Sequence, residues 1–323
     1  MNFYKRKLTL IIALVFFMLF CVAGCDDPPP QTPPEVLNQF SVHYIDVGDG
    51  DCILIKSKNG KHMLIDTGSK TTYNTVKEKL IELSVTTIDY LLLTNPTSEH
   101  VGAVEDLLND FTVSFAYIPK ILDLSLFTAF SKAKEVLETK NIPTEISYQN
   151  EYFLLEDCHI AFLTPSVGVN GAYSQLNVEF SPDKYQIGNV SPIVYCEYSG
   201  VRFLFTGDAY QSQEDLVLNF YENGIYEQVF SYYELNITLE NIDFLKVSAG
   251  GDDNATSREF LDLIKPKNAI ISVSATNSSC PSSTVLSRLF GENQNYGLYR
   301  TDVHGTISVE ISENGEYTVN KQK

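Results

Sequence analysis

The sequence predicts an α/β fold in which strands present polar side chains at one edge of a sheet. Two features predict it. An apolar strand pattern ends in a polar turn and is followed by a helical pattern, and apolar strand pairs joined by glycine occur elsewhere in the chain. In open α/β sheets, ligands bind beyond the carboxyl ends of the strands. We therefore expect the polar turns that follow buried strands to form the functional site.

The stretch around residue 95 shows the strand, the turn and the helix most clearly. Tyr90–Leu93 is an apolar run with the length of a buried parallel strand, and residues 94–100 form a polar turn after it. A helix is predicted from residue 101 to about residue 109, because apolar side chains then recur at helical spacing. The turn is the first candidate for the site.

Further elements are predicted on both sides of this stretch. Strand patterns occupy residues 40–45, 51–55, 63–65, 111–119, 152–163, 192–198, 201–205 and 269–273. Helical patterns occupy residues 74–83, 124–140, 256–264 and 282–290. Residues 168–188 are polar and are predicted to form a surface loop.

Residues 1–24 have the pattern of a signal peptide. Three basic residues at positions 5–7 precede an apolar run that extends from residue 8 to about residue 24. The run is at the short end for crossing a bilayer and has no basic flank after it, so we expect a signal peptide and not a membrane span.

The tetrapeptide Val22-Ala23-Gly24-Cys25 resembles a bacterial lipobox. The small residues would let a peptidase approach the backbone, and the Cys25 thiol would take a diacylglycerol. This predicts an exported lipoprotein anchored to the outer face of the bacterial cytoplasmic membrane. The alternative is a cleaved secretory signal followed by an incidental cysteine.

The rest of the chain is predicted to consist of a tether and one domain. Residues 25–39 contain five prolines and almost no apolar side chains, so we expect an extended tether. Residues 40–323 then form one large domain, which is long enough to bury a substantial core.

The composition argues against nucleic-acid binding. The chain has 41 acidic and 23 basic residues, which gives a net charge of −18 at pH 7. Proteins that bind nucleic acids usually present a basic stripe to the phosphates, and no such stripe is visible here.

Four cysteines lie outside the signal and the lipobox: Cys52, Cys158, Cys196 and Cys280. They are far apart in the sequence and form no C-x-x-C pair. One disulfide is compatible with an exported protein, but the sequence does not select its partners.

The turn after Leu93 resembles the signature of the metallo-β-lactamase fold. The family pattern is Thr-His-x-His-x-Asp-His followed by a small residue and an apolar helix. Here the same frame reads Thr94-Asn95-Pro96-Thr97-Ser98-Glu99-His100-Val101-Gly102. The resemblance implies a four-layer αββα sandwich, in which two mixed sheets are flanked by helices.

Three more segments are similar to the ComEC-type competence proteins and to related exported hydrolases of this superfamily. They are Asp46-Val47-Gly48-Asp49-Gly50-Asp51, Leu64-Ile65-Asp66-Thr67-Gly68 and Gly200-Val201-Arg202-Phe203-Leu204-Phe205-Thr206-Gly207-Asp208-Ala209. By this resemblance Asp208 would bridge two metal ions. The structural alternative is an aspartate that caps the helix after it.

Several ligand positions of the family are replaced in this chain. Asn95 and Thr97 occupy the positions of the first two histidines, and Glu99 replaces the family aspartate. The segment 242–257 resembles the one that carries the family's paired histidines. Its residues at those two positions, Ala249 and Gly250, have no side-chain donor.

The metal ligands that remain are Glu99, His100 and Asp208, and Asp252 and Asp253 are candidate substitutes. A catalytic zinc needs three imidazole or carboxylate ligands from the protein, so a two-zinc centre is not expected. We expect either no metal or one divalent cation. An oxygen-rich ligand set favours Mn²⁺, Mg²⁺ or Ca²⁺ over Zn²⁺.

Three further aspartates, Asp46, Asp51 and Asp66, are expected to support the site. Asp66 follows a strand, and we expect its carboxylate to accept backbone N–H bonds more than to bind a metal. The Tyr-rich segment 226–235 has no counterpart in the family pattern. It is either a partner-binding surface or a packed loop.

Two functions are weighed on these residues. The first is a membrane-anchored pseudoenzyme, a weak or non-catalytic hydrolase homologue that binds an unknown ligand or an envelope protein. The alternative is a hydrolase of a phosphoester or phosphodiester that uses a single metal ion. A role in DNA uptake is implied by the ComEC resemblance alone.

Overall fold

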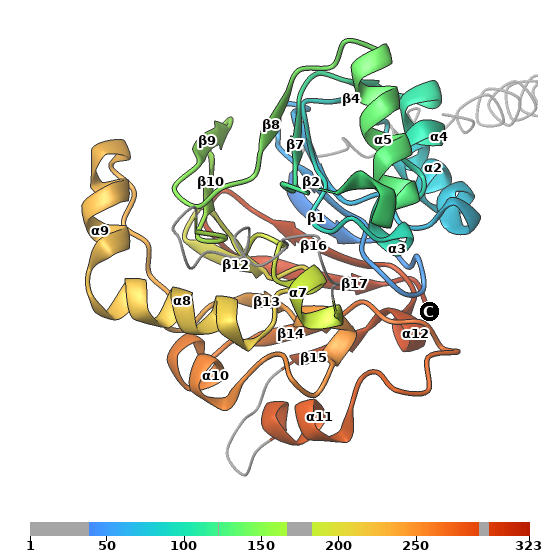
Figure 1. The fold of residues 1–323 in the computed structure, drawn as a ribbon. Coiled ribbons are helices and arrows are strands. Elements are labelled where there is room, and N and C mark those ends of the chain that lie inside the picture. Colours follow the sequence, from blue (N-terminus) through green and yellow to red (C-terminus); the bar gives the residue numbers. More distant parts are fainter. Residues whose placement is uncertain (1–38, 122, 167–182, 291–296) are drawn as a thin grey trace, which may run out of the picture. The chain divides into compact units, whose positions relative to one another are not determined.

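Two β-sheets packed face to face form the centre of the fold in the computed structural model (Figure 1). The structure describes residues 39–323 except residues 122, 167–182 and 291–296. The predicted signal, Cys25 and nearly all of the predicted tether lie outside the described residues. Within the described part of the chain, no helix has the length and apolar character needed to cross a membrane.

The first sheet has eight strands and is mixed. Its antiparallel part runs through β17 (Tyr317–Lys321), β16 (Ile307–Ile311), β1 (Phe40–Tyr44), β2 (Ile53–Lys56) and β3 (His62–Ile65). Its parallel part continues from β3 through β5 (Tyr90–Leu92), β7 (Ala116–Ile118) and β8 (Thr144–Ile146). A separate pair, β4 (Thr87–Ile88) and β6 (Thr112–Val113), lies beside it.

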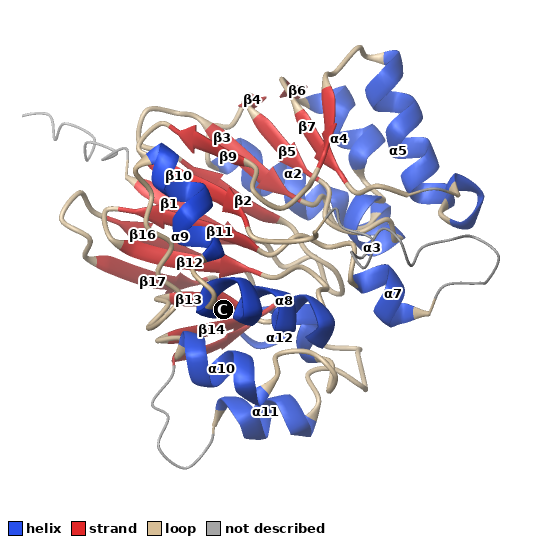
Figure 2. Cartoon of the chain, turned by 60° about the vertical axis from the view of Figure 1, so that its left-hand side comes forward, coloured by secondary structure: helices blue, strands red, loops and turns tan. Residues whose placement is uncertain are grey.

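The second sheet has seven strands and is mixed as well. Antiparallel pairing joins β9 (Tyr152–Leu155), β10 (Cys158–Phe162), β11 (Val194–Tyr198) and β12 (Val201–Phe205). Parallel pairing continues from β12 to β13 (Phe244–Lys246), β14 (Asn268–Ile271) and β15 (Gly297–Arg300). Figure 2 shows the two sets of strands with helices on both outer sides.

Helices cover the outer face of each sheet. On the first sheet lie α2 (Tyr73–Glu82), α4 (Val104–Asp110) and α5 (Thr128–Thr139). On the second lie α8 (Gln211–Glu222), α9 (Ile225–Phe230), α10 (Arg258–Ile264) and α11 (Ser283–Leu289). The remaining helices are short: η1 (Lys70–Thr72), α3 (Ser98–Val101), η2 (Leu124–Leu126), α7 (Lys184–Gly188), η3 (Ser231–Tyr233), η4 (Ser248–Gly251) and α12 (Thr301–His304).

The alternation of side chains along the strands builds the layers. In β2, Leu54 packs with the helices, whereas Ile53 and Ile55 point into the core between the sheets. This follows from the two-residue period of a strand. Three large apolar cores of the described residues therefore stack through the fold, and the four-layer αββα sandwich predicted from the sequence is confirmed.

Several predicted elements differ from the structure in detail. The strand expected at 111–119 is divided into β6 and β7, which lie in different sheets, and the strand expected at 152–163 is the antiparallel pair of β9 and β10. The helix expected at 124–140 is divided into η2 and α5. The end of the loop expected at 168–188 forms α7, because Asp183 and Gln186 make a capping box at its start. The Tyr-rich segment contains α9 and η3, in which Tyr226 is buried and Tyr232 is 85% exposed.

Candidate functional site

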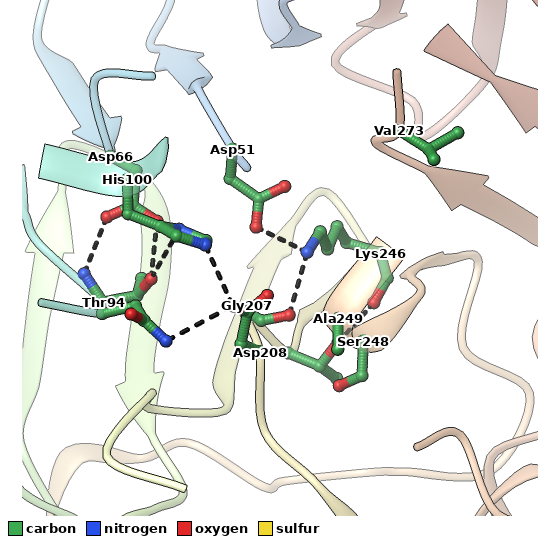
Figure 3. A network of polar contacts seen from close by, with 12 residues as sticks. Asp51, Asp66, Thr94, His100, Gly207, Asp208, Lys246, Ser248, Ala249 and Val273 are labelled. Atoms are coloured by element: carbon green, nitrogen blue, oxygen red, sulfur yellow. Dashed lines mark hydrogen bonds and ion pairs between the residues drawn. The ribbon is translucent and has the colours of Figure 1, made fainter. Parts of the chain in front are cut away.

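The site lies where strands of both sheets end and their polar side chains meet (Figure 3). Asp66 follows β3 and Thr94 comes two residues after β5, both in the first sheet. Asp208 lies in the turn after β12, and Lys246 is the last residue of β13, both in the second sheet. The neighbouring strands run parallel within each sheet, so their carboxyl ends bring these four residues to the same edge.

Asp66 is the buried anchor of the site. Its backbone has a left-handed φ of 59°, and its N–H donates to the carbonyl of Leu92 at 2.8 Å. Its Oδ1 accepts the Thr94 N–H at 2.8 Å, and its Oδ2 accepts the Thr94 hydroxyl at 2.5 Å and His100 Nδ1–H at 2.8 Å. Burial raises the pKa of the Asp66 carboxyl. The carboxylate accepts a backbone N–H, as the sequence predicts, and it also orients His100.

His100, on α3, joins the two sheets. Its Nδ1 bonds Asp66 and its Nε2 lies 3.0 Å from Asp208 Oδ2, while the ring itself is buried. Burial by itself would lower the pKa of His100, but the carboxylates of Asp208 and Asp66 outweigh it and raise the pKa well above its usual value. The raised pKa favours the imidazolium form of His100, in which both ring nitrogens donate to these carboxylates.

Asp208 is the carboxylate that accepts the hydrogen bond from His100 Nε2. Burial would raise the pKa of its carboxyl, but His100 and Lys246 outweigh burial and lower the pKa to about 2. Its side chain is 26% exposed, which makes it the most open member of the group at the His100 contact. Asp208 is therefore ionised and partly accessible.

Asn95 uses both ends of its amide inside the protein. Its Nδ2 donates to Asp208 Oδ2 at 3.3 Å, and its Oδ1 accepts the N–H of Thr97 at 3.0 Å. The amide oxygen is the atom that could bind a metal ion, and it is engaged in the turn. Asn95 thus presents a donor to Asp208 at a position where the family has a metal ligand.

A buried ion pair lies beside this network. Lys246 Nζ is 2.5 Å from Asp51 Oδ2 and donates to the carbonyl of Gly207 at 2.9 Å. The side chains of Lys246 and Asp51 are 1% and 2% exposed. The other oxygen of Asp51, Oδ1, is buried and has no hydrogen-bond partner. The pair connects the β1–β2 turn of the first sheet to β13 of the second.

Gly50 allows this turn to approach His100. It has a φ of +84°, and a Cβ at this position would lie 2.1 Å from the carbonyl oxygen of Glu99. Only glycine fits so close an approach in this conformation. The contact explains why Asp51, the next residue, reaches the site.

A metal ion could be held by one group in the described residues, formed by Asp51, Asp66 and His100, whose ligand atoms lie within 4.8 Å of one another. The fit is incomplete. Both oxygens of Asp66 already accept hydrogen bonds, and the ammonium of Lys246 contacts Asp51 directly. A cation bound there would therefore compete with Lys246 for the Asp51 carboxylate.

The family's two-metal group does not fit these residues. The amide oxygen of Asn95 is engaged, and Thr97 offers a neutral hydroxyl. Ala249 and Gly250 have left-handed φ angles of 48° and 61° in η4 and carry no donor atom on their side chains. The Ala249 N–H donates to the Gly207 carbonyl at 3.1 Å. This turn is stabilised by its own backbone and contributes no metal ligand.

The structure brings His100 and Asp208 together but separates them from the other predicted ligands. Glu99 is exposed, and it does not form a three-ligand group with His100 and Asp208 among the described residues. The remaining acidic residues have local partners: Asp252 pairs with Lys184 at 2.7 Å, Asp253 accepts from Asn254 at 2.8 Å, and Asp46 pairs with Lys323 at 3.3 Å.

Sequence reasoning missed the roles of Thr94 and Lys246. Lys246 has a readable signal, because it is a lone cation inside the apolar run 244–247 and a buried lysine needs an anionic partner. Thr94 has no such signal. Its contacts with Asp66 depend on the parallel alignment of β3 and β5, which the sequence does not specify.

Comparison with known proteins identifies the family. Residues 45–275 match the metallo-beta-lactamase superfamily. The chain is also 25% identical over 295 residues to ComE operon protein 3 of Bacillus subtilis (strain 168), a match that covers 85% of this chain and 33% of that protein. It therefore spans about a third of the length of this relative.

Solved structures with a similar fold include two that align over most of this chain. The metallo-beta-lactamase fold protein YhfI from Bacillus subtilis aligns with a TM-score of 0.47 and 9% identity, over 86% of this chain and 99% of YhfI. CmlA, a diiron beta-hydroxylase from Streptomyces venezuelae, aligns with a TM-score of 0.48 and 12% identity, over 87% of this chain and 55% of CmlA. On the match over residues 45–275, the chain belongs to the metallo-beta-lactamase superfamily.

Proposed function

We propose that this protein is a non-hydrolytic member of the superfamily that acts by binding, as a lipoprotein at the outer face of the bacterial cytoplasmic membrane. The observation that carries the proposal is the contact of His100 Nε2 with Asp208 Oδ2 at 3.0 Å. By family resemblance these are two of the three remaining ligands, with Glu99 as the third, and here each is the hydrogen-bond partner of the other. The site uses a protonated imidazole where an enzyme of this family would use a metal ion.

The charges of the site support this proposal. A carboxylate that is largely removed from solvent, as that of Asp208 is at 26% exposure, is stabilised by a nearby positive charge. His100 supplies it by direct contact, and Lys246 lowers the pKa of Asp208 further. Asn95 adds an N–H donor to the same oxygen. The carboxylate is therefore satisfied by the protein's own groups and needs no divalent cation for its neutralisation.

A second candidate is a phosphoester or phosphodiester hydrolase with a single metal ion. The specific observation in its favour is the unpartnered Oδ1 of Asp51, which belongs to the group with Asp66 and His100. An ion there would supply Lewis-acid activation of a bound water. The ammonium of Lys246 beside Asp51 counts against it, because it would repel the ion at close range.

The proposed partner is an unknown ligand or an envelope protein. The predicted lipobox at Cys25 supports anchoring at the membrane, and the net charge of −18 disfavours a polyanionic partner such as nucleic acid.

Metal content and hydrolysis test the proposal together. The full chain is incubated with Zn²⁺ or Mn²⁺, freed of excess ion, and assayed for bound metal and for cleavage of bis(p-nitrophenyl) phosphate. We expect less than about 0.1 ion per chain and no rate above that of the buffer with metal. One tightly bound ion together with turnover that His100→Ala abolishes would favour the hydrolase instead.

A matched variant shows whether the missing histidine ligands are the reason that the protein binds no metal. The triple variant Asn95→His, Thr97→His and Ala249→His restores imidazoles at family positions. Ala249 is the better choice of the pair 249–250, because a Cβ at Gly250 would press against the carbonyl of Ser272 at 3.3 Å. We expect this variant to gain metal binding, with affinity at least about 10-fold above the wild type.

Lipid labelling tests the anchoring part separately. In cells fed a radiolabelled fatty acid, the wild type is expected to carry label and to sediment with membranes. Cys25→Ser is expected to lose both properties, since the thiol is the proposed attachment point. Equal labelling of the two proteins would exclude Cys25 as the lipidation site.

A further inference from the structure

Two buried cysteines lie in contact on adjacent strands of the second sheet. Cys158 is the first residue of β10 and Cys196 lies in the middle of β11, and these strands pair antiparallel. Both side chains belong to the core between the two sheets, and Figure 2 shows the two strands side by side. Their Sγ atoms are 3.2 Å apart as free thiols. A disulfide requires about 2.05 Å, so the sulfurs need to approach by roughly 1 Å.

The other two cysteines of the described chain are placed elsewhere. Cys52 lies in the core between the first sheet and its helices, on the opposite face of that sheet. Cys280 is half-buried, and its Sγ lies 3.9 Å from the carbonyl oxygen of Ala249. Among these four cysteines, Cys158 and Cys196 are the pair whose sulfurs lie in contact. The structure thus selects partners that the sequence left open.

We propose that Cys158 and Cys196 form a disulfide when the chain folds in an oxidising compartment. The reaction is thiol–disulfide exchange with an external disulfide, such as that of an envelope oxidoreductase or oxidised glutathione. One Cys Sγ–Sγ bond forms and the S–S bond of the oxidant breaks. The two cysteines lose two electrons and two protons, and the oxidant leaves as two thiols.

The bond forms during folding and not after it. Both cysteines are completely buried in the folded chain, so an external disulfide cannot reach them. Burial also raises the pKa of the Cys158 thiol, and the thiolate is the attacking species. Exchange therefore takes place before β10 and β11 close against the first sheet. Once enclosed, the disulfide is protected from reductants by the same core.

The disulfide would link β10 to β11 and close a loop of about 38 residues. It would stabilise the folded chain by lowering the conformational entropy of the unfolded chain. For a loop of this length in a domain of this size, we expect Tm to rise by roughly 5–10 °C on oxidation. The contribution is large because the loop is long.

Refolding with differential alkylation tests the proposal. The full chain is unfolded and reduced, refolded in a mixture of oxidised and reduced glutathione, denatured, and alkylated before and after reduction with two different reagents. Peptide mapping then reports each cysteine by itself. We expect Cys158 and Cys196 to react only after reduction and to appear in one linked peptide. Cys52 and Cys280 should react before reduction. Free Cys158 and Cys196 in the refolded protein would overturn the proposal.

Matched variants and the exported protein sharpen the test. Cys158→Ala/Cys196→Ala should lose the roughly 5–10 °C difference in Tm between oxidising and reducing buffer, whereas Cys52→Ala should keep it. Mapping the protein from the cell envelope reports on export separately. The cysteines could be linked after refolding in vitro and yet be free thiols in protein taken from cells. That result would contradict export, which belongs to the proposed function, and would leave the pairing itself intact.

Discussion

The site divides into an inner group and a rim that differ in burial and in partners. The inner group consists of Asp51, Asp66, His100 and Lys246, each at most 2% exposed and each bonded to a residue from another strand end. The rim consists of Thr97, Glu99, Asp252 and Asp253, which are exposed or half-buried. The inner group joins the two sheets through the contacts of Asp51 with Lys246 and of His100 with Asp208. The buried charges of the inner group therefore hold the two sheets together. The rim carries the more exposed side chains at positions that a metal-dependent hydrolase would use for ligands.

This comparison explains how the fold tolerates the loss of metal ligands. The inner charges are paired: Lys246 contacts Asp51, and His100 contacts Asp66 on one side and the partly exposed Asp208 on the other. A buried charge is stable when it is paired and hydrogen-bonded, whatever lies at the rim. Asn95, Ala249 and Gly250 could therefore replace metal ligands without exposing an unpaired charge to the core.

Breaking the buried ion pair should have the largest effect. We expect Lys246→Met to lower the free energy of unfolding by about 3–5 kcal/mol, because the Asp51 carboxylate would remain buried without a counterion. The measurement is urea denaturation. Lys134→Met is the control, since Lys134 and Glu138 form a pair at the surface that is worth less than about 1 kcal/mol. Similar losses in the two variants would mean that burial does not decide the effect.

The double variant Lys246→Met/Asp51→Asn separates the charge from the packing. If the uncompensated carboxylate is the main cost, the second substitution should recover part of the stability lost in Lys246→Met. An additive loss would show instead that the two side chains contribute mainly by packing.

Removing the charge of Asp66 should have the next largest effect. Asp66→Asn replaces an acceptor that holds both Thr94 and His100, and we expect a loss of about 1.5–3 kcal/mol in unfolding free energy. The matched control is Asp46→Asn at the surface pair with Lys323, which should cost less than about 1 kcal/mol. Equal losses of unfolding free energy in Asp66→Asn and Asp46→Asn would contradict the distinction between the inner group and a surface pair.

The pH dependence of stability should reveal the charge of His100. Its pKa in the folded chain lies above the ordinary 6.5, so its stabilising contribution is complete below pH 6.5 and is lost as pH rises through the folded-state pKa. Above pH 6.5, the stability of the wild type relative to His100→Gln should fall by about 1.4 kcal/mol per pH unit. Parallel pH profiles for the two proteins would contradict an imidazolium at this position.

Asp208 gives the opposite limb of the profile. The pKa of its carboxyl is lowered to about 2 in the folded chain, so its contribution is present above the ordinary 3.8 and is lost as pH falls towards 2. The pair of His100 and Asp208 should therefore stabilise the fold most fully between pH 3.8 and pH 6.5, where both groups are charged in the folded chain. Urea midpoints of the wild type and Asp208→Asn across this range test the limb.

Substitutions at the rim are expected to have the smallest effect on the free energy of unfolding. Glu99→Gln should change the unfolding free energy by less than about 0.5 kcal/mol, because the side chain is exposed. Added Mn²⁺ should shift Tm of the wild type and of Glu99→Gln equally. A shift that occurs in the wild type alone would place Glu99 in a metal site and join the rim to the inner group.

Much of the fold could be predicted from the chain because strand patterns and turn residues are local signals. The runs at Tyr90–Leu92 and Val201–Phe205 lie where the sequence predicts strands. They lead into α3, which carries His100, and into the turn that carries Asp208. The site was harder to predict, since a ligand position is defined by distances across two sheets. Glu99 is adjacent to His100 in sequence, yet it is exposed while His100 is buried. One helical step is enough to turn a side chain from the core to the solvent.

The sequence by itself determined the superfamily, the mixed α/β layers and the missing imidazoles, because apolar periodicity and residue identity are properties of the chain. Only the tertiary structure decided which charges pair. Lys246 meets Asp51, and His100 meets both Asp66 and Asp208, through contacts between residues 34 to 195 positions apart. The structure also set Cys158 against Cys196. Such pairings depend on strand register and on how two sheets face each other, and neither is encoded in any single segment.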